Sequence, residues 1–311
     1  MLEINALGFD TSNYTTSAAM LLDGEMLSCG KLLPVKAGEI GLRQSDAVFH
    51  HTRQLPEVVA QLGDAVGQAK AIGVSTRPRD AEESYMPCFL VGIGTAQMLA
   101  QALQVPLYRF SHQQGHIAAA LYSANRLELL KERFLAFHLS GGTTEAVLVE
   151  PRADGLFSTK LVASSLDLKA GQVIDRIGVM LGLPFPAGKH LDPLACAYNG
   201  KIKTRASMKG ADCSLSGVEN KCRTLMEKGA ASEEIAATCM AYVISSVEGM
   251  TKALLSEYGD LPVLFSGGVS SNSMLRRLMT EKYGAIFAEP RFSADNAAGI
   301  AVLAALAQEG F

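Results

Sequence analysis

Two histidines have the spacing of a pair of metal ligands. His112 and His116 follow Ser111, a residue type that caps helix N-termini. On a helix, a spacing of four residues places both imidazoles on one face, where two ring nitrogens can bind one metal ion at roughly 2.0–2.1 Å. A capping or packing pair is the alternative interpretation. The candidate third ligand is Asp295, which equally suits the positive N-terminal end of the helix that follows it.

A glycine-rich turn is the candidate phosphate site. Ser140, Gly141 and Gly142 connect two apolar runs, at 137–139 and 144–149. Adjacent glycines let backbone N–H groups curl toward an anion without interference from Cβ atoms, and Ser140 adds a hydroxyl donor. A β-hairpin that binds nothing uses the same residue types, so that alternative stays open.

The same pattern occurs near the N-terminus. Residues 9, 12, 15, 16 and 18 are identical to the residues 128 positions later (137 minus 9), which are Phe137, Ser140, Thr143, Thr144 and Ala146. The chain is therefore predicted to consist of two halves that each begin with strand, polar turn and strand. In the first half Asp10 ends a strand and is followed by Thr and Ser12, a pattern common in phosphate-binding loops, where the carboxylate holds a metal-bound water or orients a phosphate. Asp10 and Ser12 are therefore the candidate catalytic residues. An ordinary turn is the alternative.

Two further segments are candidates for binding a nucleoside. Gly267 and Gly268 follow an apolar strand and let a base approach the backbone, and Asn272 is placed to hydrogen-bond it. Asp175, an acidic residue on an otherwise apolar helix, is the candidate for the ribose hydroxyls, with Gly188 leaving room for the sugar. A turn without a ligand, and a surface carboxylate paired with a basic side chain, are the alternatives.

Alternating strand and helix patterns place these residues. Three strands are predicted over 6–33, with a tight hairpin at Asp23-Gly24, and then one helix over 45–69, kinked at Pro56. Later strands are predicted at 71–75, 105–110 and 262–266, and later helices at 85–103, 169–181 and 232–258. This alternation indicates an α/β fold with ligand between two halves, divided here into residues 1–125 and 126–311.

The composition fits a soluble globular protein without a general affinity for nucleic acid. The chain has 311 residues, 48% of them hydrophobic, with a net charge of −3 and a pI of about 6.1. Any RNA contact therefore needs a local basic patch. The basic segment 200–210 is the candidate, but it has no interleaved aromatic residue, and a solvated loop is the alternative. Scattered cysteines predict reduced, buried thiols, and no signal peptide or membrane span is expected.

The motifs, taken in order, resemble the TsaD family of tRNA threonylcarbamoyl-adenosine transferases, formerly labelled glycoproteases. The resemblance covers nearly the whole chain. It rests on Asp10-Thr11-Ser12, His112 to His116, Ser140 to Thr144, Ala170 to Asp175, Pro186-Ala187-Gly188, Leu215-Ser216-Gly217, Gly267-Gly268-Val269 with Asn272, and Asp295-Asn296-Ala297.

The resemblance implies an actin-like ATPase fold (the ASKHA fold) of two duplicated lobes with a nucleotide in the cleft. It also implies one divalent metal, iron or zinc, held by His112, His116 and Asp295. The implied reaction transfers a threonylcarbamoyl group from threonylcarbamoyl-adenylate to adenosine in tRNA, in the cytoplasm. The implied partners are tRNA and either a TsaB-like paralogue or a second copy of the chain, with no membrane.

An adenine nucleotide, ATP or threonylcarbamoyl-adenylate, is implied as the second bound group. The resemblance puts its phosphates near residues 140–142, its ribose near Asp175 and Gly188, and its base near Gly268 and Asn272. In such enzymes the protein positions the reactants and the metal polarises the intermediate, without a covalent nucleophile.

The sequence departs from the family pattern at the first turn. Where family members carry Glu-Thr-Ser-Cys-Asp-Glu-Thr, this chain has Asp10-Thr-Ser-Asn-Tyr-Thr-Thr16, so Tyr14 and Thr15 replace an acidic pair. A divergent paralogue that binds nucleotide and metal as a non-catalytic partner, or acts on another acceptor, is therefore the main alternative. A metalloprotease rests only on the paired histidines and the older label, because no Glu follows His112 as the base of an H-E-x-x-H motif.

Overall fold

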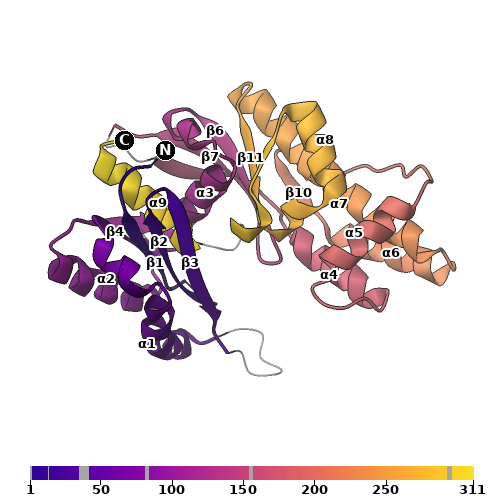
Figure 1. The fold of residues 1–311 in the computed structure, drawn as a ribbon. Coiled ribbons are helices and arrows are strands. Elements are labelled where there is room, and N and C mark those ends of the chain that lie inside the picture. The colour runs from indigo at the N-terminus through magenta and orange to yellow at the C-terminus, as the bar shows by residue number, and fades with distance from the viewer. Residues whose placement is uncertain (1, 13, 35–41, 81–83, 154–156, 293–295) are drawn as a thin grey trace. The chain divides into compact units, whose positions relative to one another are not determined.

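The chain forms two compact units, shown in Figure 1. The computed structural model describes residues 2–12, 14–34, 42–80, 84–153, 157–292 and 296–311. Unit 1 comprises residues 1–131, 151–159 and 291–311, and unit 2 comprises residues 132–150 and 160–290. The predicted division into residues 1–125 and 126–311 puts the C-terminal residues in the second lobe. In the structure, residues 291–311 belong to unit 1.

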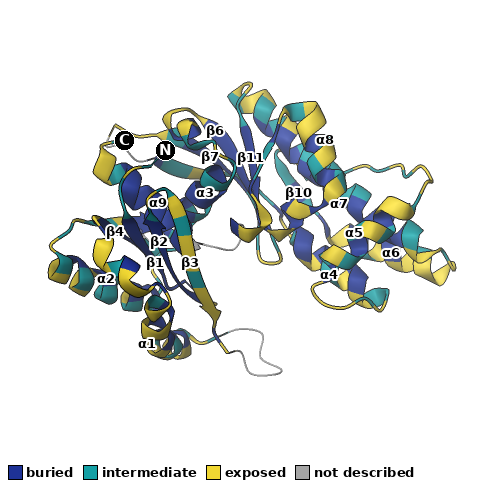
Figure 2. Cartoon of the chain, viewed as in Figure 1, coloured by how far each residue is buried: buried dark blue, intermediate teal, exposed yellow. Residues whose placement is uncertain are grey.

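Unit 1 is built on a five-stranded mixed sheet with the strand order β3-β2-β1-β4-β5. Its strands are β1 (Ala6–Asp10), β2 (Thr15–Leu22), β3 (Glu25–Leu32), β4 (Ala71–Arg77) and β5 (Leu107–Ser111). The first three pair antiparallel, and β4 and β5 continue the sheet in parallel. The predicted hairpin is confirmed: Asp23 and Gly24 both have positive φ, 50° and 84°, as the central residues of a type I′ turn do. The edge strand β3 is mostly exposed (Figure 2).

Helices cover both faces of this sheet. They are α1 (Gln44–Ala60), α2 (Phe89–Leu103), α3 (His112–Ser123) and α9 (Asn296–Glu309). Leu7 and Phe9 of β1 share a buried cluster with residues of α1 and α2. Gly8, between them, faces α9, where a Cβ would lie 2.3 Å from the carbonyl oxygen of Ala297. Because side chains alternate along a strand, α9 lies on the opposite face of the sheet from α1 and α2.

The helix predicted over 45–69 is shorter than expected. α1 ends at Ala60 with Pro56 inside it, and a separate 3₁₀ helix follows at Gly63–Gln68. Gly63 has a φ of 58°, the left-handed conformation that commonly terminates an α-helix. The apolar periodicity continues past this residue, which is why the sequence pattern extended the helix too far.

Most of a second five-stranded sheet, with the order β12-β11-β6-β7-β8, belongs to unit 2, and the last residue of β7 and residues 157–159 of β8 are grouped with unit 1. Its strands are β6 (Phe134–Leu139), β7 (Thr144–Pro151), β8 (Phe157–Ser164), β11 (Val263–Ser266) and β12 (Ile286–Phe287). The repeat seen in the sequence is confirmed by register. Phe9 pairs with Ala18 in the β1–β2 hairpin, and Phe137 pairs with Ala146 in the β6–β7 hairpin. Both hairpins also pair in parallel with a later strand, β4 and β11 respectively.

The helices of unit 2 pack around a large apolar core. They are α4 (Ala170–Met180), α5 (Gly188–Ala197), α6 (Ser216–Glu227), α7 (Ser232–Tyr258) and α8 (Ser273–Tyr283), and a small ribbon is formed by β9 (Ser207–Lys209) and β10 (Asp212–Ser214). Phe137 and Phe265 stack in the core with ring centroids 4.8 Å apart. The predicted α/β fold is confirmed, and none of the described helices is both long and apolar enough to span a membrane. The expectation of buried thiols is confirmed for Cys88, Cys213, Cys222 and Cys239, but it is wrong for Cys196, which is exposed, and for Cys29, which is partly exposed.

Candidate functional site

The two histidines lie side by side at the start of α3. Ser111 caps this helix: its Oγ accepts a hydrogen bond from the Gln114 N–H (3.2 Å), and Gln114 Oε1 accepts one from the Ser111 N–H (2.8 Å). This capping box fixes His112 in the first turn. The ring centroids of His112 and His116 are 4.6 Å apart, so the predicted common face exists.

Asp10 orients His112 from the end of β1. Its Oδ2 lies 2.8 Å from His112 Nδ1, and its Oδ1 accepts a hydrogen bond from the Ser12 N–H at 2.8 Å. Burial opposes ionisation of Asp10, but the His112 imidazole and the hydrogen bonds from Ser12 hold the pKa of the carboxyl well below its usual range. Because the carboxylate engages Nδ1, the nitrogen that His112 presents to a ligand is Nε2.

The described residues supply two candidate histidine ligands of a metal centre and the carboxylate that supports one of them. A metal-bound histidine typically donates its other ring N–H to a carboxylate, as His112 is placed to do with Asp10. Two imidazoles and a carboxylate form a donor set suited to zinc or iron. The predicted third ligand, Asp295, lies outside the described residues. Within the described ranges, no group of three or more His, Cys, Asp or Glu side chains could hold a metal ion.

A buried histidine, which the sequence analysis missed, lies in the same unit. His51 of α1 is fully buried, and its Nδ1 is 2.8 Å from Thr16 Oγ1. Thr16 donates its only hydroxyl proton to Gln54 Oε1 (2.9 Å), so His51 Nδ1 must carry the proton that bonds to Thr16. Nε2 is then an acceptor, and it has no hydrogen-bond partner among the described residues. His51 is therefore held neutral.

We expect this histidine to make the stability of the protein depend on pH. Burial lowers the pKa of His51 to about 4 from 6.5, although the Asp10 charge opposes the shift. Below pH 6.5 the unfolded chain binds a proton that the folded chain does not, so stability falls as the pH drops toward 4. Urea unfolding at pH 7 and pH 4.5 should show a loss of about 2–3 kcal/mol from this residue. The loss should be smaller in His51→Asn, and an equal loss in both proteins would contradict the assignment.

Unit 2 contains a cavity of about 570 Å³ at the predicted nucleotide site. Six of the eight predicted nucleotide-binding residues line it: Ser140, Gly141, Asp175, Gly188, Gly268 and Asn272. Gly142 and Gly267 are not among the lining residues. Gly267 has a φ of 90°, and a Cβ there would lie 2.3 Å from the Leu139 carbonyl oxygen. Its role in the structure is therefore to let the turn after β11 pass close to the end of β6.

The glycine-rich turn abuts the N-terminus of α4. Ser140 N–H donates to the Thr143 carbonyl (2.7 Å), and Thr143 N–H donates to Ser140 Oγ (3.1 Å), which closes the turn. Gly171 N–H donates to the Ser140 carbonyl at 3.1 Å. A Cβ on Gly171 would lie only 2.6 Å from the Gly141 nitrogen, so the helix approaches the turn as closely as glycine allows. Backbone N–H groups at a helix N-terminus favour an anion.

Asp175 and Asn272 line the cavity and also accept hydrogen bonds from backbone N–H groups. Asp175 Oδ1 accepts a hydrogen bond from the Ala187 N–H at 2.8 Å, which ties α4 to the loop before α5. Its sequence neighbour Arg176 pairs with Glu219 instead. Asn272 caps α8 through Oδ1, which accepts from the Leu275 N–H at 2.9 Å.

Asp192 is a lining residue that the sequence analysis missed. Asn272 Nδ2 donates to its Oδ1 at 2.7 Å, and the Ser273 N–H donates to its Oδ2 at 3.1 Å. Lys189 also lines the cavity. The available signal was helical spacing: Asp192 follows Gly188 by four residues and Lys189 by three, so Asp192 is a neighbour of each on the surface of α5.

The fold occurs in known structures. HypF from T. kodakarensis superposes with a TM-score of 0.59 at 16% identity, over 99% of this chain and 48% of that one. Component A of the (R)-2-hydroxyglutaryl-CoA dehydratase from Acidaminococcus fermentans gives a TM-score of 0.55 at 17% identity, over 99% of both chains. At these identities the likeness shows the fold alone. The predicted actin-like ATPase fold is confirmed.

Sequence comparison identifies the family. The profile described as TsaD: tRNA N6-adenosine threonylcarbamoyltransferase matches residues 41–302. A protein of that name from Pelodictyon phaeoclathratiforme is 30% identical over 334 residues, covering 97% of this chain and 92% of the relative. A protein of the same name from Streptococcus pneumoniae is 31% identical over 316 residues, covering 95% of this chain and 90% of the relative. The chain therefore belongs to the TsaD family of tRNA N6-adenosine threonylcarbamoyltransferases.

Proposed function

We propose that this protein transfers a threonylcarbamoyl group from threonylcarbamoyl-adenylate to adenosine in tRNA, with a TsaB-like paralogue or a second copy as partner. The observation that carries the proposal is the cavity in unit 2. Its volume of about 570 Å³ suits a nucleotide-sized ligand, and it gathers six residues from four separate segments that the sequence had assigned to phosphate, ribose and base.

The residues of this cavity would bind and orient the adenylate. The backbone N–H groups of Gly141 and Gly142, at the positive N-terminal end of α4, would hold its phosphate, whereas the N–H groups of Ser140 and Gly171 close the turn. Asp175 uses Oδ1 to fix the loop before Gly188, so Oδ2 remains for the ribose hydroxyls. The base would lie against Gly268, where no side chain obstructs the backbone, beside Asn272. This positioning lowers the entropic cost of the transfer.

The histidines of unit 1 would hold the metal. His112, His116 and Asp295 would be its ligands, and a bound iron or zinc ion would act as a Lewis acid on the carbamoyl oxygen. Asp10 fixes the orientation of His112 and keeps its Nδ1 proton in place, and the Ser12 N–H holds Asp10. In this proposal the two predicted catalytic residues act through His112, so they position the ligand that meets the metal.

Replacing Asp175 separates its two roles. In Asp175→Ala both the ribose contact and the bond from Ala187 are lost, and we expect the Kd for ATP to rise by about 10- to 100-fold. Asp175→Asn keeps a carbonyl oxygen for the Ala187 N–H but loses the charge, so a smaller increase is expected. Isothermal titration calorimetry with ATP measures both. Unchanged affinity in Asp175→Ala would remove Asp175 from the nucleotide site.

The proposed activity is tested by transfer in vitro. Purified protein, loaded with iron or zinc and mixed with its partner candidates, is incubated with threonylcarbamoyl-adenylate and a tRNA transcript, and the digested nucleosides are analysed by mass spectrometry. Threonylcarbamoyl-adenosine is the expected product. Because Tyr14 and Thr15 replace the family's acidic pair, the second candidate is a non-catalytic paralogue. Binding of metal and nucleotide without product would favour that candidate.

A further inference from the structure

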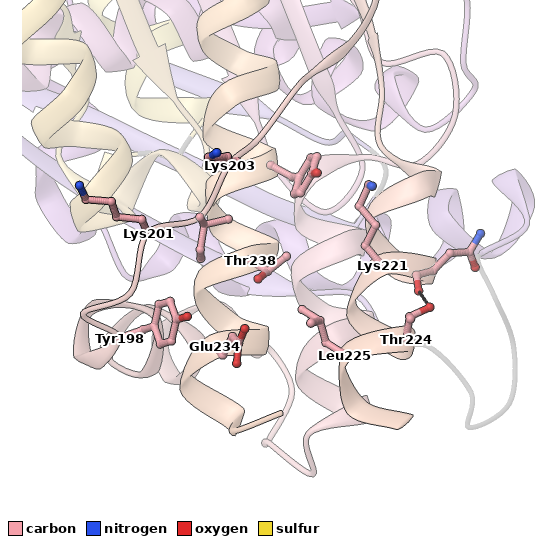
Figure 3. Close-up of a pocket in the computed structure, with 11 residues that line it drawn as sticks. Tyr198, Lys201, Lys203, Lys221, Thr224, Leu225, Glu234 and Thr238 are labelled. Atoms are coloured by element: carbon pink, nitrogen blue, oxygen red, sulfur yellow. Dashed lines mark hydrogen bonds between the residues drawn. The ribbon is translucent and has the colours of Figure 1, made fainter. Parts of the chain in front are cut away.

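Unit 2 has a second hollow, which shares no lining residue with the nucleotide cavity. This open groove of about 560 Å³ lies between the segment after α5, helix α6 and helix α7. Figure 3 shows its lining side chains. Neither the phosphate, ribose and base assignments nor the metal ligands involve any of these residues, so the groove is separate from the nucleotide and metal sites proposed above.

The groove carries positive charge. Lys201 and Lys203 reach it from the segment after α5, and Lys221 reaches it from α6. Glu234 is the acidic side chain among the described residues that line it. In the described part of the chain, no acidic group forms an ion pair with any of the three lysines. Their charges are therefore available to an external anion.

The surroundings of Lys221 explain why its charge is not neutralised locally. Glu219, on the same helix, pairs with Arg223 and Arg176 at 3.0 and 2.8 Å. Lys221 instead lies over the ring of Tyr242, with Nζ 5.2 Å from the ring centroid. Such a cation–π contact restrains the ammonium group while it keeps its full charge. The exposed side chain is therefore held beside Tyr242 at the groove.

The fold also supplies the aromatic residues that the basic segment lacks. Segment 200–210 has none, but Tyr198 and Tyr242 both line the groove. The Tyr198 ring lies against Gly200, where a Cβ would come within 2.3 Å of its Cζ and Oη atoms. Glycine at 200 thus allows the ring to occupy this position. The tyrosines and Asn220 add neutral hydrogen-bond donors of the kinds that contact phosphate and sugar oxygens.

We propose that this groove binds the sugar–phosphate backbone of tRNA, and this inference rests on the proposed function. A chain with a net charge of −3 has no global attraction for RNA, so the polyanion must be held by local cations. Three lysines that form no ion pair in the described part of the chain, set among hydroxyl and amide side chains and outnumbering the lining carboxylate of Glu234, form such a patch. An RNA backbone fits this chemistry better than a protein partner, because the lysines and the hydroxyl and amide donors match phosphate and sugar oxygens, and the aliphatic side chains among the described lining residues are Ile202 and Leu225.

Fluorescence anisotropy with a labelled tRNA transcript and the full-length protein tests the groove. In the variant Lys201→Ala/Lys203→Ala/Lys221→Ala we expect the Kd at about 150 mM salt to rise by about 10- to 100-fold, and the slope of log K against log salt to fall by about two. The matched control is Lys252→Ala, which removes an exposed lysine of α7 that does not line the groove. Its Kd should be unchanged, and replacing the three lysines by arginine should preserve binding.

The possible results separate this inference from the proposed function. The triple alanine variant must still bind ATP with the native Kd, which shows that unit 2 is folded. If the triple alanine variant also binds tRNA with the native Kd, and the native protein transfers the threonylcarbamoyl group to tRNA, the groove assignment is overturned and the proposed transferase function stands. If the variant loses binding only to phosphatidylserine vesicles, the groove is a membrane site and the RNA assignment is overturned. If the native protein neither binds nor modifies tRNA, both proposals fail.

Discussion

Replacing His112 with alanine is expected to release the bound metal and to abolish most of the transfer activity. The variant loses one of two adjacent imidazoles and removes the ionic partner of the buried Asp10 carboxylate. Loss of Lewis-acid assistance, worth several kcal/mol, corresponds to about a 100- to 10,000-fold decrease in rate. Elemental analysis should find one metal ion per chain in the native protein and little in the variant.

Two further variants make this experiment specific. His50→Ala removes a histidine of α1 that is outside the candidate site and should keep the metal and the activity. Asp10→Asn should retain a metal site, but with an affinity lowered by about 10- to 100-fold, because it weakens the orientation of His112. If His112→Ala binds as much metal as the native protein, the ligand assignment is wrong.

Adding a side chain at Gly171 is expected to abolish nucleotide binding. A Cβ there would lie 2.6 and 2.7 Å from the nitrogen and Cα of Gly141, and 2.8 Å from the Ser140 carbonyl carbon. These are backbone atoms, so α4 and the glycine-rich turn must move apart in Gly171→Ala. We expect a Kd for ATP at least about 100-fold higher, and a loss of about 1–3 kcal/mol in the free energy of unfolding.

The control for Gly171 is another glycine in the same unit. Gly217 lies in the first turn of α6, and a Cβ built on it meets no atom within 4 Å. Gly217→Ala should therefore leave ATP binding unchanged and should not destabilise the helix. Isothermal titration calorimetry with ATP and circular dichroism compare the two variants. Native ATP affinity in Gly171→Ala would mean that the turn does not hold the phosphate.

Local patterns were sufficient to predict much of the fold. The Asp23-Gly24 hairpin, the capping of α3 by Ser111 and the bounds of α7 each depend on residues close in sequence. The relation between the β1–β2 and β6–β7 hairpins was also visible, because the identical residues occupy equivalent positions in register. The end of α1 was not predicted, because a single glycine at position 63 outweighs the apolar periodicity that continues beyond it.

The packing of the C-terminal helix could not be predicted from the sequence. α9 contacts β1, β4 and α3, elements far from it in the chain. The approach requires glycine on both sides: a Cβ on Gly299 would lie 1.8 Å from the Gly115 carbonyl oxygen, and one on Gly73 would lie 2.7 Å from that of Ile300. Isolated glycines in a helix or a strand do not reveal which distant element approaches them.

In the candidate sites, too, contacts between residues close in sequence were predictable, and contacts between residues far apart in sequence were not. The spacing of His112 and His116 was readable, but the bond between Asp10 and His112 joins residues 102 positions apart. Asp192 was missed because its partner Asn272 is 80 positions away. His51 was missed because no nearby motif distinguishes it, and its burial and hydrogen bond to Thr16 arise only when α1 packs on the sheet.

The most direct test of the central claim is mass spectrometry of tRNA nucleosides from cells that lack this gene. The cells are complemented with the native sequence or with His112→Ala. We predict that threonylcarbamoyl-adenosine is lost in the deletion, restored by the native protein and not restored by the variant. An unchanged level of the nucleoside in the deletion would contradict the account, because another protein would then carry out the transfer in these cells.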